Sequence, residues 1–457
     1  MKFHGSALIL CAFAFAPILF LQAETTDPQE NLMHGKLSPM FDLASPDLRS
    51  SAILPVKISD DPDSSDPGSV NIPLEFYFGY GTPPQTVPGV NSINSAYMAG
   101  AYASDKLFER FLDIENDSGP AAIALRMARA TVYDFPMASM ANLAVHEVFG
   151  HGGAAREIGM DTNYSFSPYP FMGGAATWYD PKKYGELSSQ DRIRLTSAGT
   201  MATQTGALEM RRRMLESGAV HWSAWPLWAL QKYDLSRYIT STLGYSDQEL
   251  AFEASQGNDI AKYIMLLNEG HGKSIDRSRK ELQMAAMWNA ADPMAIAALY
   301  NYGYKHIIKG NNFTPPPLVT IGKYQYSMGT RSGLTPTGPE MYLDLYARNP
   351  SNNMLLEVNG RGGFDDQIGG GARLSNIPLT DNASFALHAN AWKQNEFSTD
   401  DSFTGIDGGG SVKWYPTDRI GIQLESGYKT DGSLMGRQYD EGGYFSGGIL
   451  VQPQPTK

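Results

Sequence analysis

The spacing of apolar residues changes from helical to strictly alternating along the chain, and this change constrains the fold more than any other feature. Between about 101 and 308, Ala, Leu and Met recur every three or four residues, as in Ala121 to Ala130, which predicts helices. Asn311 to Pro317 is a proline-rich break, and beyond it apolar and polar residues alternate, as they do in strands. The sequence therefore predicts an α+β chain, with a helical domain over 71–310 and an antiparallel β domain over 318–452.

About eight alternating segments follow the break, near residues 322, 341, 354, 369, 384, 409, 421 and 444. In one of them, Phe385 and Leu387 fall on one face of a strand while Ser384 and His388 fall on the other. An even number of strands, joined alternately by short turns and longer polar loops, is typical of outer-membrane barrels, although the chain lacks their usual terminal aromatic residue. We therefore expect an antiparallel β-barrel of about eight strands, with a soluble antiparallel sandwich or barrel as the alternative.

The first residues have the layout of a secretory signal, with Lys2, an apolar stretch from Ala7 to Leu21, and Ala23 before Glu24. We expect a signal peptide over 1–23 and a disordered leader over 24–70, because the leader has too little apolar periodicity to fold. The single cysteine, Cys11, falls in the signal, so disulfides and cysteine-bound metals are excluded from the mature chain. The expected location is the periplasm or outer membrane of a Gram-negative-type bacterium.

The charge of the chain excludes one class of partner. Its formal net charge is -12, whereas proteins that bind nucleic acid need clustered Lys and Arg to contact phosphates. After the signal, no apolar run approaches the roughly 20 residues of a membrane-spanning helix. Membrane contact would therefore have to be made by strands, and the outer membrane is the expected partner of the β domain.

The motif His146-Glu147-Val148-Phe149-Gly150-His151 lies inside the helical region. Two imidazoles on one short segment suit Zn²⁺, and a catalytic zinc site leaves one position open for water. Glu147, beside the first histidine, is placed to accept the proton of that water as it attacks a carbonyl carbon. The motif therefore predicts metal-assisted hydrolysis, with Zn²⁺ as cofactor and a peptide or protein as substrate.

The spacing of the two histidines requires a distortion of the helix. Zinc-binding histidines on a regular helix lie four residues apart, but His146 and His151 lie five apart. A step of five residues rotates by roughly 140° in an α-helix, which would point the rings apart. A π-bulge restores their facing, and Gly150 supplies room for it.

The motif resembles those of known metallopeptidases. His-Glu-x-x-Gly-His is the zinc motif of dipeptidyl peptidase III and of the microcin-maturation metallopeptidases. The following residues, from Gly152 to Gly159, are similar to the tail of the motif in site-2-type proteases, and Leu187 to Thr200 resembles the stretch before their Ala-Gly-Pro element. The resemblance implies a zinc metallopeptidase that uses His146 and His151 as metal ligands and Glu147 as general base.

Two carboxylates compete for the role of third metal ligand. Glu209 lies on a later helix rich in small residues, as in families with this motif; alternatively, it pairs with Arg213 on the same helix. Asp259 is the second candidate, because Gly257 and Asn258 would begin a helix that directs it inward, although an acidic residue there also favours the helix dipole. His221 and His271 are candidate oxyanion donors.

Two functions remain open from the sequence. The first is a zinc metallopeptidase that cleaves peptide bonds, with a variant in which the same site hydrolyses another ester or amide. The second is an outer-membrane structural or binding protein with a metal site that has no catalytic role. Glu147 is essential only for the first.

Overall fold

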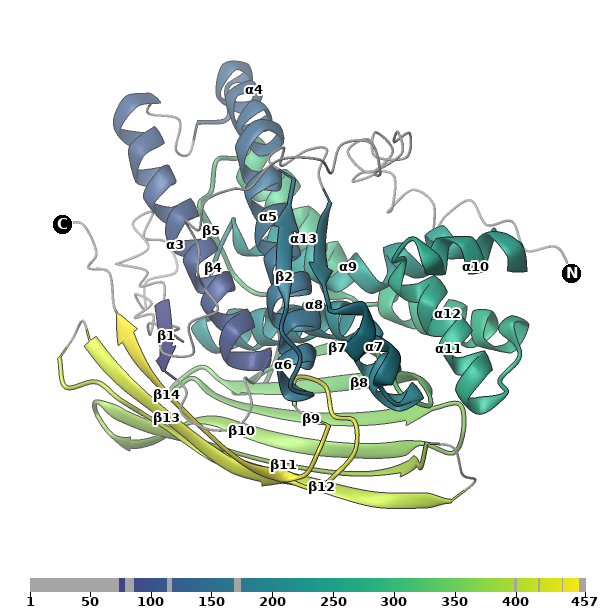
Figure 1. The fold of residues 1–457 in the computed structure, drawn as a ribbon. Coiled ribbons are helices and arrows are strands. Elements are labelled where there is room, and N and C mark those ends of the chain that lie inside the picture. The colour runs from purple at the N-terminus through teal and green to yellow at the C-terminus, as the bar shows by residue number, and fades with distance from the viewer. Residues whose placement is uncertain are drawn as a thin grey trace, which may run out of the picture.

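The chain forms a layer of helices packed on one face of a large antiparallel sheet (Figure 1). The computed structural model describes residues 74–78, 86–112, 117–167, 174–397, 401–417, 420–437 and 439–451. The predicted signal peptide and leader lie outside these residues. The predicted order of a helical region followed by strands is confirmed.

Among the described residues, the helical layer contains α-helices and three π-helical segments. Their bounds are α3 Thr86–Leu112, α4 Pro120–Arg129, η2 Ala130–Asp134, α5 Phe135–Ala144, η3 Val145–His151, α6 Gly152–Glu157, α7 Pro181–Glu186, α8 Ser189–Ser217, α9 Ala224–Thr242, α10 Asp247–Ser255, α11 Asp259–His271, α12 Ile275–Ala290, α13 Met294–Ala298 and η4 Leu299–Ile308. Among the described residues, no helix has the length and apolar character needed to cross a bilayer.

Local sequence sets the limits of the long helices. The hydroxyl of Ser188 accepts a hydrogen bond from the backbone of Asp191 at the start of α8, and Asn258 does the same for Ala261 in α11. Gly218, with a φ of 71°, ends α8 in the left-handed conformation that glycine adopts most easily. Trp222, just before α9, and Trp225 and Trp228 on α9 are fully buried and form part of the core of the helical layer.

The sheet contains ten strands in the order β1-β14-β13-β12-β11-β10-β9-β8-β7-β6. The strands are β1 Leu74–Phe78, β6 Val319–Ile321, β7 Tyr324–Thr335, β8 Gly338–Asn349, β9 Met354–Gly363, β10 Ile368–Thr380, β11 Ala383–Asn395, β12 Ser402–Trp414, β13 Ile420–Lys429 and β14 Gly442–Val451. Two separate two-stranded antiparallel sheets are formed by β2 Asn163–Phe166 with β3 Ala175–Trp178 and by β4 Val220–His221 with β5 Phe313–Thr314.

The expectation of a closed barrel was wrong for the part of the chain that the structure describes. The eight strands predicted from alternation are present as β7 to β14, but β6 and β1 flank them as the two ends of an open sheet. β1 lies within the region predicted as the helical domain, but it pairs with β14 and extends the sheet. This pairing occupies the edge of β14, which is one reason why the sheet stays open.

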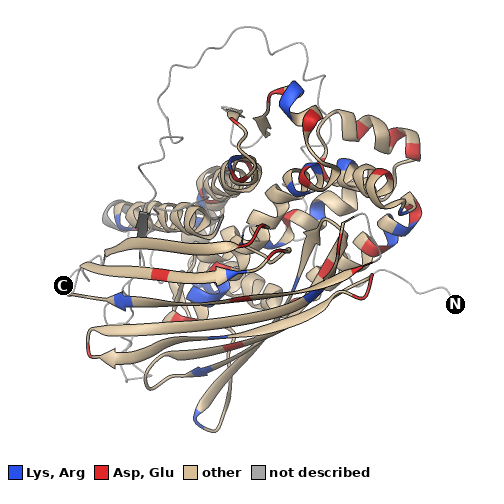
Figure 2. Cartoon of the chain, turned by 60° about the horizontal axis from the view of Figure 1, so that its bottom comes forward, with Lys and Arg blue, Asp and Glu red and all other residues tan. Residues whose placement is uncertain are grey.

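The face of the sheet that contacts the helices is polar, and the opposite face is apolar. On β11, Phe385 and Leu387 do share one face, as predicted, but that face is the accessible one. His388 lies on the face toward the helical layer, and its side chain is 7% exposed. The helices lie on one side of the strands in both views (Figures 1 and 2). The usual arrangement of a sheet, with its apolar face in the core, is therefore inverted here.

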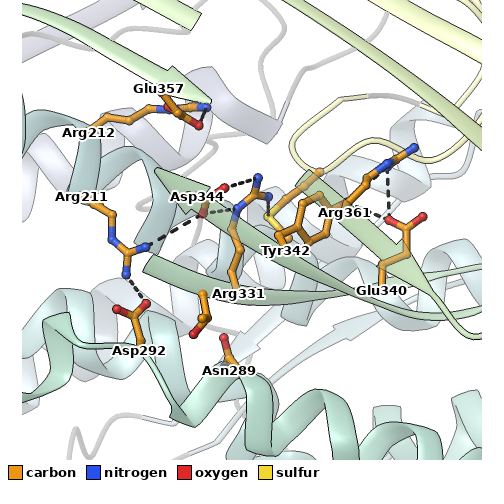
Figure 3. Close-up of polar contacts among 12 residues, drawn as sticks. Arg211, Arg212, Asn289, Asp292, Arg331, Glu340, Tyr342, Asp344, Glu357 and Arg361 are labelled. Carbon is orange, nitrogen blue, oxygen red and sulfur yellow. Dashed lines mark hydrogen bonds and ion pairs between the residues drawn. The ribbon is translucent and has the colours of Figure 1, made fainter. Parts of the chain in front are cut away.

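Buried ion pairs join helix α8 to the polar face (Figure 3). Two nitrogens of Arg212 lie 2.6 and 2.8 Å from the carboxylate oxygens of Glu357 on β9. Arg211 pairs with Asp292 and lies 4.0 Å from Asp344 on β8. These charges have partners on both sides of the interface, which is the condition under which buried charges are tolerated.

Candidate metal centre

The histidine motif lies on a π-helical turn within a continuous helical run. Segment η3 covers Val145–His151, between α5 and α6. The predicted π-bulge is therefore confirmed, and it brings the rings of His146 and His151 to a centroid separation of 5.0 Å. Both histidines and Glu147 are buried.

Three ligand atoms converge at one point. Nε2 of His146 and Nε2 of His151 are 3.2 Å apart, and Oδ2 of Asp259 lies 3.0 Å from the first and 3.1 Å from the second. Among the described residues, these side chains form the group of His, Cys, Asp and Glu able to hold a metal ion. A tetrahedron with metal–ligand distances of about 2 Å has edges of roughly 3.3 Å, so the spacing suits three ligands of one metal ion.

The other nitrogen of each ring is already occupied by an acceptor. Nδ1 of His146 lies 2.9 Å from Oδ2 of Asp234 on α9, and Nδ1 of His151 lies 2.7 Å from the carbonyl oxygen of Leu195 on α8. A carbonyl can only accept, so Nδ1 of His151 carries the proton, and the carboxylate favours the same for His146. When the rings are neutral, the lone pairs of both Nε2 atoms therefore face the point of convergence, as in metal-binding histidines.

Two glycines allow this close packing. A Cβ on Gly150 would lie 2.5 Å from Cα of Gly199 on α8, so neither helix could approach the other with a side chain there. A Cβ on Gly199 would lie 2.3 Å from Nε2 of His146 and 2.5 Å from Nε2 of His151. Gly150 therefore serves close helix contact, and Gly199 forms the floor under both imidazoles.

The structure brings Asp259, and not Glu209, to the two histidines. Asp259, the second candidate, is the first residue of α11 and reaches both histidines. Glu209 lies further along α8 and pairs with Arg212. Burial opposes its ionisation, but Arg212 and nearby arginines lower the pKa of Glu209 to about 2. Its partner is thus Arg212 at i,i+3, and not the Arg213 that the sequence suggested.

The electrostatics of the centre favour a cation. Burial alone would raise the pKa of Asp259, but contacts with His151 and His146 hold it well below its usual value. Asp234 behaves similarly: burial opposes its charge, and His146 lowers its pKa. Both carboxylates are therefore ionised around neutral pH, and they offset the charge of a bound divalent ion.

Glu147 lies beside the ligands and is oriented by a neighbouring strand. Oε2 of Glu147 accepts a hydrogen bond of 2.7 Å from Oγ1 of Thr177 on β3, and the same hydroxyl lies 3.1 Å from the carbonyl oxygen of Glu147. Tyr179 follows this strand, and its pKa is raised by burial and by the charges of Asp259 and Glu147. The hydroxyl of Tyr179 therefore stays protonated around neutral pH.

Sequence reasoning missed the residues that support the ligands. Asp234 and Tyr238 are one turn apart on α9, and the ring of Tyr238 stacks on His146 at 5.6 Å. No motif or spacing links them to His146, 88 residues earlier along the chain. The candidate oxyanion donors lie elsewhere: His221 contacts Asp105 and Ser223, and His271 contacts the carbonyl oxygen of Pro336.

Comparisons with protein families, with curated proteins and with solved structures find no match to this chain. The likeness to metallopeptidases thus rests on the motif and the segments around it. The function is argued below from the geometry of the centre.

Proposed function

We propose that this chain is a zinc-dependent hydrolase, and specifically a metallopeptidase. The observation that supports this most is the direction of three ligand atoms, from His146, His151 and Asp259, toward one point. Two imidazoles and a carboxylate form a donor set of the kind found in catalytic zinc sites, which leave a position open. When bound, zinc supplies a Lewis acid and lowers the pKa of water at the site.

The side chains around the centre have separate roles in the proposed reaction. Glu147 receives the proton of the attacking water and delivers it to the leaving amine, as a general base and then a general acid. Thr177 holds the carboxylate in place through the 2.7 Å hydrogen bond to Oε2. Asp234 fixes the orientation of His146.

The alternative is a structural or binding protein whose metal has no catalytic role. Three observations on Glu147 favour the catalytic reading. The side chain is buried, it accepts a hydrogen bond from Thr177, and it is not among the residues that converge as metal ligands. A general base must lie next to the metal ligands without binding the metal itself, and Glu147 has this position. The hydrolysis of another ester or amide uses the same groups and differs only in substrate.

The test combines metal analysis with an activity assay. Protein beginning at Glu24 is expected to hold about one zinc per chain, and His146→Ala with His151→Ala to hold none. Glu147→Gln should keep the metal and lose cleavage of a fluorogenic peptide library by at least about a hundredfold. Wild type that binds zinc but cleaves no peptide, or Glu147→Gln that retains full activity, would favour the non-catalytic alternative. Wild type without metal after reconstitution would refute both.

A further inference from the structure

The uncovered face of the large sheet is apolar over most of its width. Twenty of the large hydrophobic side chains that are exposed in the described residues lie on strands β6 to β14. Examples are Ile406, 55% exposed, Leu387, 53% exposed, and Phe445, 49% exposed. At roughly half exposure each, these side chains leave on the order of 1,500 Å² of apolar surface in the open, several times the largest patch of a typical soluble monomer.

The apolar side chains form continuous rows across the strands. Backbone pairing places Leu345, Val358, Ala372, Ala389, Gly408 and Tyr428 side by side, from β8 to β13. Among the described residues of β9 to β14, Lys393 is the charged side chain on this face, and it lies near one end of β11. The described strands β9 to β14 therefore carry almost no charge on this face.

The charged side chains of the same strands are on the opposite, buried face. Glu357, Asp407 and Lys429 are each at most 3% exposed. Arg361 on β9 lies 3.2 Å from Glu340 on β8, within the helical layer's interface (Figure 3). A sheet that faces water on one side places its polar residues outward, so this sheet has the polarity expected when its outer face meets hydrocarbon.

We propose that this apolar face contacts the hydrocarbon of a lipid bilayer, while the helical layer and the metal centre stay on the other side of the sheet. Strands β7 to β14 have 10 to 13 residues, and a tilted strand needs about 9 to 11 to span a bilayer. The outer face also carries Tyr324 and Trp414 near one end of the strands and Tyr428 near the other. Aromatic residues at both ends match the two polar boundaries of a bilayer.

The sheet's open edges are compatible with this placement. Strand β6 pairs with Tyr324, Gln325 and Tyr326 of β7, and with no other strand in the described part of the chain. Beyond that point the helical layer covers β7: Oγ1 of Thr330 donates to the carbonyl oxygen of Trp288 at 2.8 Å, and Oγ of Ser332 donates to that of Ala285 at 2.6 Å. At the other end, β1 lies against α3. Parts of both edges therefore lie beside protein, as a bilayer requires of edge backbone groups.

A second copy of the chain fits this face less well. The sheet curls around the helical layer (Figure 1), so its outer face is convex, and two convex faces touch over only part of their area. A standard interface buries about 800 Å² on each partner, which would leave much of the apolar surface exposed. This proposal does not depend on the proposed function, because it involves neither the metal nor Glu147.

The test uses a fluorescent probe on the full chain. In a Cys11→Ser background, Leu387→Cys is labelled with a polarity-sensitive fluorophore; the matched control is Phe252→Cys on α10, where Phe252 is 61% exposed in the helical layer. With phosphatidylcholine vesicles, emission at position 387 should shift to shorter wavelength and be quenched by lipids with spin-labelled tails. Emission at position 252 should not change.

A substitution provides a second readout. Leu387→Arg should lower the vesicle-bound fraction at least about tenfold, because an arginine near the middle of a bilayer is strongly unfavourable, whereas Phe252→Arg should bind as the wild type does. Circular dichroism and a cooperative thermal transition report that each variant is folded. A label at position 387 that stays accessible to aqueous iodide with vesicles present would overturn the proposal. So would crosslinking between copies at 387 without lipid, which would assign the face to a second chain.

Discussion

Nδ1 of His146 lies 2.9 Å from Oδ2 of Asp234, and this contact turns Nε2 of the same ring toward Asp259 and His151. The carboxylate of Asp234 is buried and also accepts a hydrogen bond of 3.1 Å from Oγ1 of Thr203. A residue that no motif reveals therefore determines how a motif residue presents its lone pair.

The first prediction concerns this contact. Asp234→Asn should weaken zinc affinity by roughly 10- to 100-fold, because partners behind a ligating histidine fix its orientation and raise its basicity. Competition with a fluorescent zinc chelator measures the change. Asp247→Asn, at an exposed position on α10, is the control, and equal affinities of the two variants would show that Asp234 does not support the metal.

The second prediction separates the two candidate ligands. Asp259→Asn should lose the metal, because a neutral amide is a poor replacement for the third ligand, whereas Glu209→Gln should retain about one zinc per chain. Elemental analysis of both proteins after zinc reconstitution decides between them. Loss of metal from Glu209→Gln alone would restore the assignment that the sequence favoured.

The third prediction concerns the floor of the centre. Gly199→Ala introduces a methyl group where Nε2 of His146 lies 2.3 Å away, so the imidazoles must move and zinc should be lost. Gly100→Ala on α3 is the matched control, because nothing lies within 4 Å of its added Cβ; it should keep the metal and leave stability unchanged or raised by up to about 1 kcal/mol. Full metal content in Gly199→Ala would contradict the packing described here.

The fourth prediction concerns pH and stability. Burial raises the pKa of Glu157 from 4.5 to about 7, although Arg194, 3.5 Å away, acts to lower it. The folded chain therefore holds a proton that the unfolded chain has already released, and this contribution is complete below about pH 4.5 and lost as pH rises through 7. The difference corresponds to about 3 kcal/mol.

Glu157→Gln tests that contribution. Between pH 5 and 7 the free energy of unfolding of this variant should fall less than that of the wild type. Chemical denaturation at several pH values measures it, with Glu186→Gln, at an exposed position, as the control. Identical pH profiles for the wild type and Glu157→Gln would show that this carboxyl does not titrate as described.

Local periodicity was sufficient to predict the strands and the helical distortion. Strict alternation located β7 to β14, and a rotation argument on His146 and His151 predicted the π-helical turn. Both depend only on neighbouring residues. The third ligand depends instead on how α11 and α8 pack, and sequence distance does not determine which of Asp259 and Glu209 reaches the histidines.

The closure and the polarity of the sheet were also beyond local reasoning. Alternation shows that Leu387 and His388 face opposite ways, but not which of them is buried. That depends on the partner layer, and the arginines at 211 and 212 of α8 favour a polar surface beneath them. The pairing of β1 with β14 joins segments more than 360 residues apart, and nothing in either segment specifies the other.

The ion pairs between α8 and the sheet bear on how the protein unfolds. A fragment that ends near residue 310 would leave the arginines at 211 and 212 without Asp344 and Glu357. A fragment that begins after residue 310 would expose the face of the strands that the helices cover. Separating the two layers would leave charged side chains on both sides without their partners, which is strongly unfavourable for buried ion pairs. We therefore expect one cooperative thermal transition, and limited proteolysis that yields no stable half.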